Sequence, residues 1–174
     1  MKKMMKKAFL LMVLMFVPFA MQAQTKFHDV EANEATGPVK SMSVSGMMGN
    51  TRVINFTPDG KMQQEGIKDA VYDADGYLQS FKMEMQGMGI EIGLKWENGR
   101  VKTQIMKAMG NETPINFVYG DKGEIVSQNM SFGGQDMSIP FTDYVFDDHG
   151  NWISRKSSMM GQENTETRKI EYYE

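Results

Sequence analysis

Residues 144–152 read YVFDDHGNW, and this stretch decides the fold. Tyr144 and Phe146 stand two positions apart, so in an extended strand their side chains share one face. Two aspartates and Gly150 follow, which are the residues that a tight turn needs, because glycine adopts positive φ without steric cost. An apolar residue, Trp152, then returns two positions after the glycine. The stretch therefore predicts one β-hairpin.

The same pattern recurs along the chain, with a nonpolar or aromatic residue two before an aromatic and a glycine three or four after it. The other copies begin at Ile54, Ala70, Leu94 and Phe117, and their returning apolar residues are Met62, Leu78, Val101 and Ile125. A period of this kind predicts an all-β chain of successive hairpins. The repeated aromatics can pack in the core, as cross-strand pairs usually do, or stack on a ligand where solvent reaches them.

A second kind of turn joins these hairpins at their opposite ends. It is rich in glycine and methionine at residues 46–50, 85–89, 109–111, 133–137 and 159–162, and a connection without methionine falls at 65–69. The alternation predicts a single antiparallel meander of about twelve strands. Because strands twist, we expect so large a sheet to curl into a trough or a partly closed barrel. If it stays open, residues 39–45 and the last strand are expected to be exposed edges.

The first 23 residues have the order of a secretory signal peptide. Four lysines precede an uncharged apolar run from Ala8 to Ala20, and cleavage is expected after Ala23, with Ala20 as the alternative. The apolar run is too short to span a bilayer as a helix, so no membrane span is expected after cleavage. Residues 24–37 are polar and are expected to form a flexible arm, and residues 38–174 to form the β-hairpin domain. The protein is therefore expected in the periplasm or outside the cell.

The composition narrows the possible partners and chemistry. Removing the signal peptide takes away four lysines and no acids, which leaves 15 basic and 22 acidic residues and a net charge of −7. This charge argues against nucleic acid as a partner. The chain has no cysteine, so disulfides, thiol nucleophiles, thiolate metal sites and a lipid-modified cysteine are excluded.

Residues 144–155 and 167–173, with the opening at 37–42, resemble a family of exported bacterial proteins that carry degenerate YD-type repeats, a pattern also found in Rhs proteins. The resemblance extends over most of the mature chain, although the methionine-rich turns depart from the usual pattern. It implies a stack of β-hairpins in an extended sheet and a surface or periplasmic role in binding or scaffolding. It implies no catalytic residues.

No catalytic residue or cofactor is predicted. The two histidines, His28 and His149, stand in the polar arm and in a turn, and neither has a motif that supplies a nucleophile or an orienting partner. The acidic turns at 73–76 and 147–151 resemble calcium loops in composition, but they lack the required spacing and the terminal glutamate. Ordinary turn chemistry accounts for their aspartates and glycines.

Thirteen methionines remain after the signal peptide, many of them at the glycine–methionine turns. They can be core packing or compositional drift, an adaptable apolar binding surface, or a soft-metal site, because thioethers suit Cu(I) and Ag(I). The metal alternative rests on Met83, Met85 and Met88. The predicted binding rim consists of Met47, Met48, Met109, Met137, Met159 and Met160.

These features favour a non-enzymatic exported protein that binds another protein or a cell-surface macromolecule, through the methionine–glycine turns or by strand addition at a sheet edge. The first alternative is periplasmic soft-metal binding, and the second is an enzyme whose site is assembled only by folding. A rim predicts exposed methionines without converging sulfurs, a copper site predicts three sulfurs around one point, and an enzyme predicts a deep polar pocket.

Overall fold

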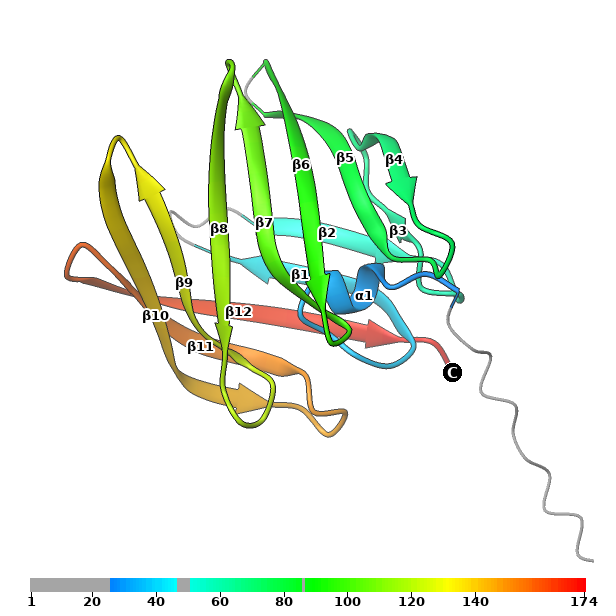
Figure 1. Cartoon of the computed structure of the whole chain (residues 1–174). Helices are drawn as coiled ribbons and strands as arrows, with labels where there is room; N and C mark the ends of the chain where they lie inside the picture. Colours follow the sequence, from blue (N-terminus) through cyan, green and yellow to red (C-terminus); the bar gives the residue numbers. More distant parts are fainter. Residues whose placement is uncertain (1–25, 47–50, 86) are drawn as a thin grey trace, which may run out of the picture.

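The computed structural model describes residues 26–46, 51–85 and 87–174, so the predicted signal peptide, Met47 and Met48 lie outside the described residues. Within these ranges the chain forms one short helix and twelve strands (Figure 1). The elements are α1 Asp29–Ala32, β1 Val39–Ser45, β2 Thr51–Phe56, β3 Met62–Gln63, β4 Lys68–Tyr72, β5 Leu78–Met85, β6 Met88–Glu97, β7 Arg100–Ala108, β8 Asn111–Tyr119, β9 Ile125–Phe132, β10 Gln135–Phe146, β11 Trp152–Met159 and β12 Gln162–Tyr172.

The strands form one antiparallel sheet in the order β3-β2-β1-β12-β11-β10-β9-β8-β7-β6-β5-β4, which confirms the predicted all-β hairpin meander. The prediction that residues 39–45 and the last strand are free edges is wrong. β1 pairs with β12, with Met42 opposite Ile170, so the first and last strands join inside the sheet as its third and fourth strands. The edges are instead β3 and β4, which the connection at 64–67 links without strand pairing.

The sheet curls strongly but is not closed into a barrel. Figure 1 shows β5 to β8 running up the front of the molecule, while β1, β2 and β12 run across behind them. Strongly coiled sheets fold back in this crosswise way when bulges bend their strands. Bulges interrupt the pairing of β10 with β11 between Thr142 and Phe146. Two parts of one sheet therefore face each other and enclose the core between them.

The repeated aromatics fix neighbouring hairpins to one another. In two repeats the aromatic residue, and in a third repeat the tyrosine two before it, donates an N–H or O–H to the carbonyl of the apolar residue that returns after the preceding acidic turn. The donors are Trp96, Tyr119 and Tyr144, and the acceptors are Leu78, Val101 and Ile125 respectively. Each acceptor residue is at most 4 % exposed, so these bonds satisfy buried carbonyl groups that would otherwise be costly. The repeat is thus a structural device that holds the register.

The expectation of a flexible arm at residues 24–37, without helix, is wrong for the described part of this segment. Helix α1 lies on the concave side of the sheet (Figure 1), where Val30 and Ala35 are each 3 % exposed and pack in a core cluster with β1 and β2. Asp29 is completely buried. The sequence does not predict this packing because the segment holds few apolar residues. Val30 and Ala35 are nevertheless enough to anchor it, because the curled sheet provides an interior in which they are buried.

The segment also spans the gap between the two sheet edges. The Oδ2 atom of Asp29 accepts hydrogen bonds from the Met62 backbone N–H of β3 at 2.7 Å and from the Tyr72 hydroxyl of β4 at 2.8 Å. Just before it, the backbone N–H of Phe27 donates to Asp59 and that of His28 donates to Gly76. The N-terminal segment therefore joins edges that do not pair with each other. Among the described residues, no helix is long and apolar enough to cross a membrane.

Candidate functional site

The curled sheet encloses a cavity of about 320 Å³, a volume within the range of small-molecule sites. One wall is apolar and comes from the inward faces of β5 to β9. Its residues are Leu78, Phe81, Met83, Ile90, Ile92, Leu94, Val101, Met106, Phe117 and Ile125. Ile90, Ile92 and Leu94 follow the alternation expected for one face of a strand. Phe81 and Met106 stand an odd number of positions from Leu78 and Val101, so the hydrophobic repeat accounts for only part of this wall.

The opposite wall carries three arginines and Trp152. Arg155 of β11 and Arg168 of β12 are each 5 % exposed, and their guanidinium carbons lie 4.2 and 3.9 Å from the centre of the Trp152 ring. Contacts of cations with an aromatic face are attractive and strengthen when water is excluded. Trp152 is itself 5 % exposed, and its indole N–H has no hydrogen-bond partner among the described residues.

Two of these arginines hold the N-terminal segment in place. Arg155 forms ion pairs with Glu34 at 2.6 Å and Glu166 at 2.8 Å. Arg168 donates to the backbone carbonyls of Asn33 and Glu34, and also to that of Trp152. Burial lowers the pKa of Arg168 to about 10, and nearby Glu34 only partly offsets this effect. Arg168 is thus a positive charge at neutral pH, and its described hydrogen-bond partners are all uncharged.

The third arginine and three amides remain available to a ligand. Arg52 of β2 lines the cavity, and desolvation lowers its pKa, although the negative charge of Glu34 acts in the opposite direction. Gln64, Gln104 and Gln128 line the same cavity. Among the described residues, none of these four side chains forms a hydrogen bond or an ion pair. The cavity thus combines an apolar wall with one cationic group and several neutral donors and acceptors.

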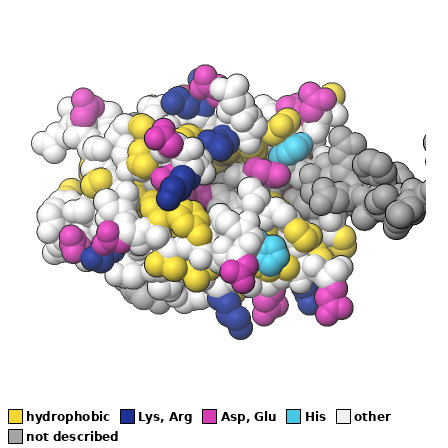
Figure 2. All heavy atoms as spheres, turned by 90° about the horizontal axis from the view of Figure 1, so that it is seen from below, with side chains coloured by type: hydrophobic (Ala, Val, Ile, Leu, Met, Phe, Trp, Pro, Cys, Tyr) yellow, Lys and Arg dark blue, Asp and Glu magenta, His cyan; other side chains and the backbone are white. Residues whose placement is uncertain are grey.

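A second hollow of about 270 Å³ lies at the end of the sheet that carries the acidic turns. Figure 2 views the molecule from this end and shows hydrophobic and charged side chains interspersed over the face, with both histidines on it. The two hollows share five residues, which are Glu31, Glu34, Tyr119, Ile125 and Trp152. The N-terminal segment and Trp152 therefore separate the hollow at the turns from the interior cavity.

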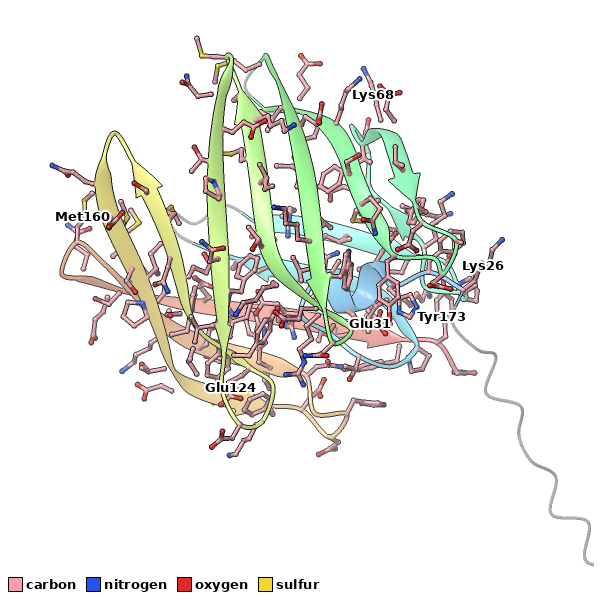
Figure 3. All side chains as sticks on the ribbon, viewed as in Figure 1. Lys26, Glu31, Lys68, Glu124, Met160 and Tyr173 are labelled. Atoms are coloured by element: carbon pink, nitrogen blue, oxygen red, sulfur yellow. The ribbon has the colours of Figure 1, made fainter. Side chains whose placement is uncertain are left out.

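The predicted rim methionines occupy two environments. Met109 and Met160 are each 82 % exposed at turn tips, where both adopt positive φ, and Figure 3 shows Met160 at the end of its hairpin. Met137 and Met159 are half-buried and pack against the core. Met47 and Met48 lie outside the described residues. Among the rim methionines that the structure describes, Met109 and Met160 alone are strongly exposed.

The proposed soft-metal residues stand at the end of one hairpin. Met83 lines the interior cavity, whereas Met88 is 44 % exposed. Met85 pairs with Met88 across the turn, and its side chain lies outside the described part of the chain. Copper binding by this trio stays a prediction.

The acidic turns use their carboxylates to bind the backbone. Asp73 accepts from the N–H groups of Asp75 and Tyr77, and Asp147 accepts from those of His149 and Asn151. Hydrogen bonds of this kind are the Asx-turn chemistry that the sequence indicated. Both histidines lie flat against tyrosines, His28 on Tyr77 and His149 on Tyr172.

The interior polar residues were missed, although two of them left a signal. Arg52 shares its strand face with Ile54 and Phe56, and Arg168 shares its face with Ile170. A charged residue on the apolar face of a strand departs from the expected alternation and marks an unusual interior. Arg155 left no such signal because a bulge between Trp152 and Ser154 changes the alternation.

Comparison of the chain with protein-family models, with curated proteins and with solved structures found no match. The resemblance to YD-repeat proteins accordingly stays a prediction, and the functional argument rests on the residues of this chain.

Proposed function

We propose that this protein is an exported, non-enzymatic binding protein that holds a small amphipathic anion in the interior cavity. The observation that carries the proposal is the pairing of an apolar wall with Arg52, a cavity guanidinium without an ion-pair partner among the described residues. A ligand with a carboxylate or similar anionic group and an apolar body, such as a medium-chain fatty acid, matches both features.

The charges of the cavity support an anionic ligand over a neutral one. Arg155 is balanced by Glu34 and Glu166, whereas Arg168 is surrounded by carbonyl groups. Arg52 is exposed and lines the cavity, so its guanidinium group is accessible to a ligand. An anion in the cavity could pair with Arg52, and Gln104 and Gln128 could hydrogen-bond to its remaining lone pairs.

The experiment is a titration of the purified protein with dansyl-labelled undecanoic acid, followed by displacement with dodecanoate. Saturable fluorescence enhancement and displacement are expected. Arg52→Gln should weaken binding roughly tenfold to a hundredfold, the range expected for a hydrogen bond to a charged group. The control is Lys102→Gln, which removes an exposed positive charge from β7. Equal affinity in wild type and Arg52→Gln would overturn the assignment of the anion to this arginine.

A second candidate is binding of a protein or cell-surface macromolecule at the methionine–glycine turns. The observation that favours it is the exposure of Met109 and Met160 in backbone conformations that suit asparagine or glycine better. An apolar side chain at a strained and exposed position suggests a contact with a partner whose binding free energy offsets the strain. Loss of a partner in Met109→Asn with Met160→Asn, with the fold intact, is the expected result for this candidate.

A further inference from the structure

Several buried polar atoms of residues that line the hollow at the acidic turns have no hydrogen-bond partner among the described residues. The described residues include five buried side-chain polar atoms without a hydrogen-bond partner, and three of these belong to residues that line this one hollow. They are Oε2 of Glu31, Oε2 of Glu124 and the indole N–H of Trp152. Unsatisfied buried polar atoms are rare and costly, so three around one hollow require an explanation.

Neighbouring side chains in the described part of the protein do not satisfy these atoms. The nearest ionic neighbour of Glu31 is Nδ1 of His28, at 3.7 Å from Oε2, which is beyond hydrogen-bond distance. Trp152 is 5 % exposed, and the guanidinium carbons of Arg155 and Arg168 lie 4.2 and 3.9 Å from the centre of its ring. Its indole N–H has no hydrogen-bond partner among the described residues and is the polar group of this side chain that a ligand oxygen could engage.

The chemistry of the hollow is balanced between donors and acceptors. Glu31 and Glu124 accept hydrogen bonds, whereas Arg100, Lys122 and the Trp152 N–H donate them. Two carboxylates and two cations leave no net charge, because Glu34, the remaining acid, is paired with Arg155. A neutral ligand with both hydroxyl donors and oxygen acceptors fits this lining better than an ion does.

An aromatic surface completes the hollow. Phe146 lines it and is 38 % exposed, which is high for a phenylalanine in a strand of this sheet. Figure 3 shows Glu31 at α1 and Glu124 at the β8–β9 turn, so the two carboxylates come from different elements of the lining. Hydroxyls project from several positions of a sugar ring and can therefore reach groups on different elements, and the C–H face of the ring packs on aromatic side chains.

We propose that this hollow is a binding site for a neutral sugar, with its ring against Phe146 and its hydroxyls hydrogen-bonded to Glu31, Glu124 and the Trp152 N–H. The site shares five residues with the interior cavity, but Glu124, Phe146, Arg100 and Lys122 line this hollow alone, and the sugar proposal does not depend on the anion proposed for the cavity. The two sites share Trp152, so its indole N–H reports on both.

The test is a titration of the ¹⁵N-labelled protein with maltose, cellobiose and N,N′-diacetylchitobiose, followed through the two tryptophan indole signals. A saturable shift of the Trp152 signal by at least one sugar is expected. The Trp96 signal should stay fixed, because its N–H is bonded to the Leu78 carbonyl at 2.8 Å. Phe146→Ala should weaken the response about tenfold, as for the loss of one aromatic contact. Val145→Ala, which removes an exposed side chain from the next position of β10, should not.

Two further variants separate ligand binding from damage to the fold. Glu124→Gln should weaken sugar binding, whereas Asp121→Asn, in the same turn but outside the hollow, should leave it unchanged. Arg52→Gln, which tests the interior cavity, should also leave sugar binding unchanged. Absence of any shift with all three sugars, or a shift that Phe146→Ala and Val145→Ala affect equally, would overturn the assignment. A shift caused by free amino acids and by none of the sugars would overturn it as well.

Discussion

The Oδ2 atom of Asp29 lies 2.8 Å from the hydroxyl of Tyr72, and this contact ties the N-terminal segment to edge strand β4. The same oxygen accepts the backbone N–H of Met62 on the other edge, β3. A single carboxylate thus links two edges that share no strand pairing. Residues that lie far apart in the sheet order are consequently held together by a segment that precedes the sheet in sequence.

Replacing Asp29 should open this link. Asp29→Ala leaves the Met62 N–H and the Tyr72 hydroxyl unsatisfied, so the free energy of unfolding should fall by roughly 2 kcal/mol. Asp29→Asn keeps an accepting oxygen and should stay close to wild type. Urea unfolding of the two variants measures the difference. Equal losses in both variants would show that the hydrogen bonds do not carry the stability.

Asp29 and Asp147 should change the free energy of unfolding in opposite directions as the pH falls. Burial raises the pKa of Asp29, so the folded state holds its proton more tightly, and its contribution to stability declines as the pH rises through the folded pKa. For Asp147, burial acts to raise the pKa, but hydrogen bonds from Tyr172 and from the Asn151 and His149 backbone outweigh it, and the pKa is lowered. Its contribution is present above the unfolded value of about 3.9 and is lost as the pH falls through the folded pKa.

Variants should resolve these two contributions. Asp147→Asn is expected to flatten the loss of stability in acid, and Asp29→Asn to make that loss steeper, because each removes one of two opposing slopes. Unfolding free energies measured at a series of pH values between neutral and about 3, below the ordinary aspartate pKa, provide the check. Parallel pH curves for wild type and both variants would contradict the assignment.

Gly76 should be far more sensitive than Gly110, although both adopt positive φ. A Cβ atom at Gly76 would overlap the carbonyl oxygen of Lys26, whereas one at Gly110 meets open space. Gly110→Ala should therefore cost about 1 kcal/mol for the left-handed backbone alone, and Gly76→Ala distinctly more. If thermal unfolding gives the same loss for both, the N-terminal segment is not packed over the β4–β5 turn.

Met109→Asn and Met160→Asn should each stabilise the protein. Both methionines take positive φ immediately before a glycine of positive φ, which is the type I′ turn for which Asn-Gly is preferred. At the opposite end of the sheet the chain itself uses Asn98-Gly99 in this conformation. A gain of about 0.5–1 kcal/mol per site is expected in urea unfolding, and a loss would contradict the turn assignment.

The sequence was sufficient for the sheet because its signals are local. The spacing between Phe146, Gly150 and Trp152 describes one hairpin, and repetition extends it to twelve strands. Pairing of β1 with β12 joins residues more than a hundred positions apart, and no local pattern encodes it. The position of the N-terminal segment could not be predicted either. Asp29 is held by hydrogen bonds from Met62 and Tyr72, and only the curvature of the sheet brings these two residues together.

The candidate site could be predicted only in part, for the same reason. Strand alternation places Arg52 on the face of Ile54, so the sequence alone predicts a charged residue on the face that lines the cavity. Arg155 reaches that interior through a bulge, and the two hollows exist only because the sheet curls around the N-terminal segment. The environments of the methionines could not be predicted, because a methionine side chain suits a core, an exposed surface or a soft metal equally well. Among those described, Met137 packs against the core and Met160 is exposed at a turn tip.

The most direct test of the central claim follows the two tryptophan indole signals of the ¹⁵N-labelled protein during titration with dodecanoate. Trp152 lines the cavity with a free N–H, whereas the Trp96 N–H is bonded to Leu78. The predicted result is a saturable shift of the Trp152 signal alone, which requires roughly tenfold to a hundredfold more dodecanoate in Arg52→Gln. Signals that stay unchanged at saturating dodecanoate, or a response identical in Arg52→Gln, would contradict an anion-binding cavity.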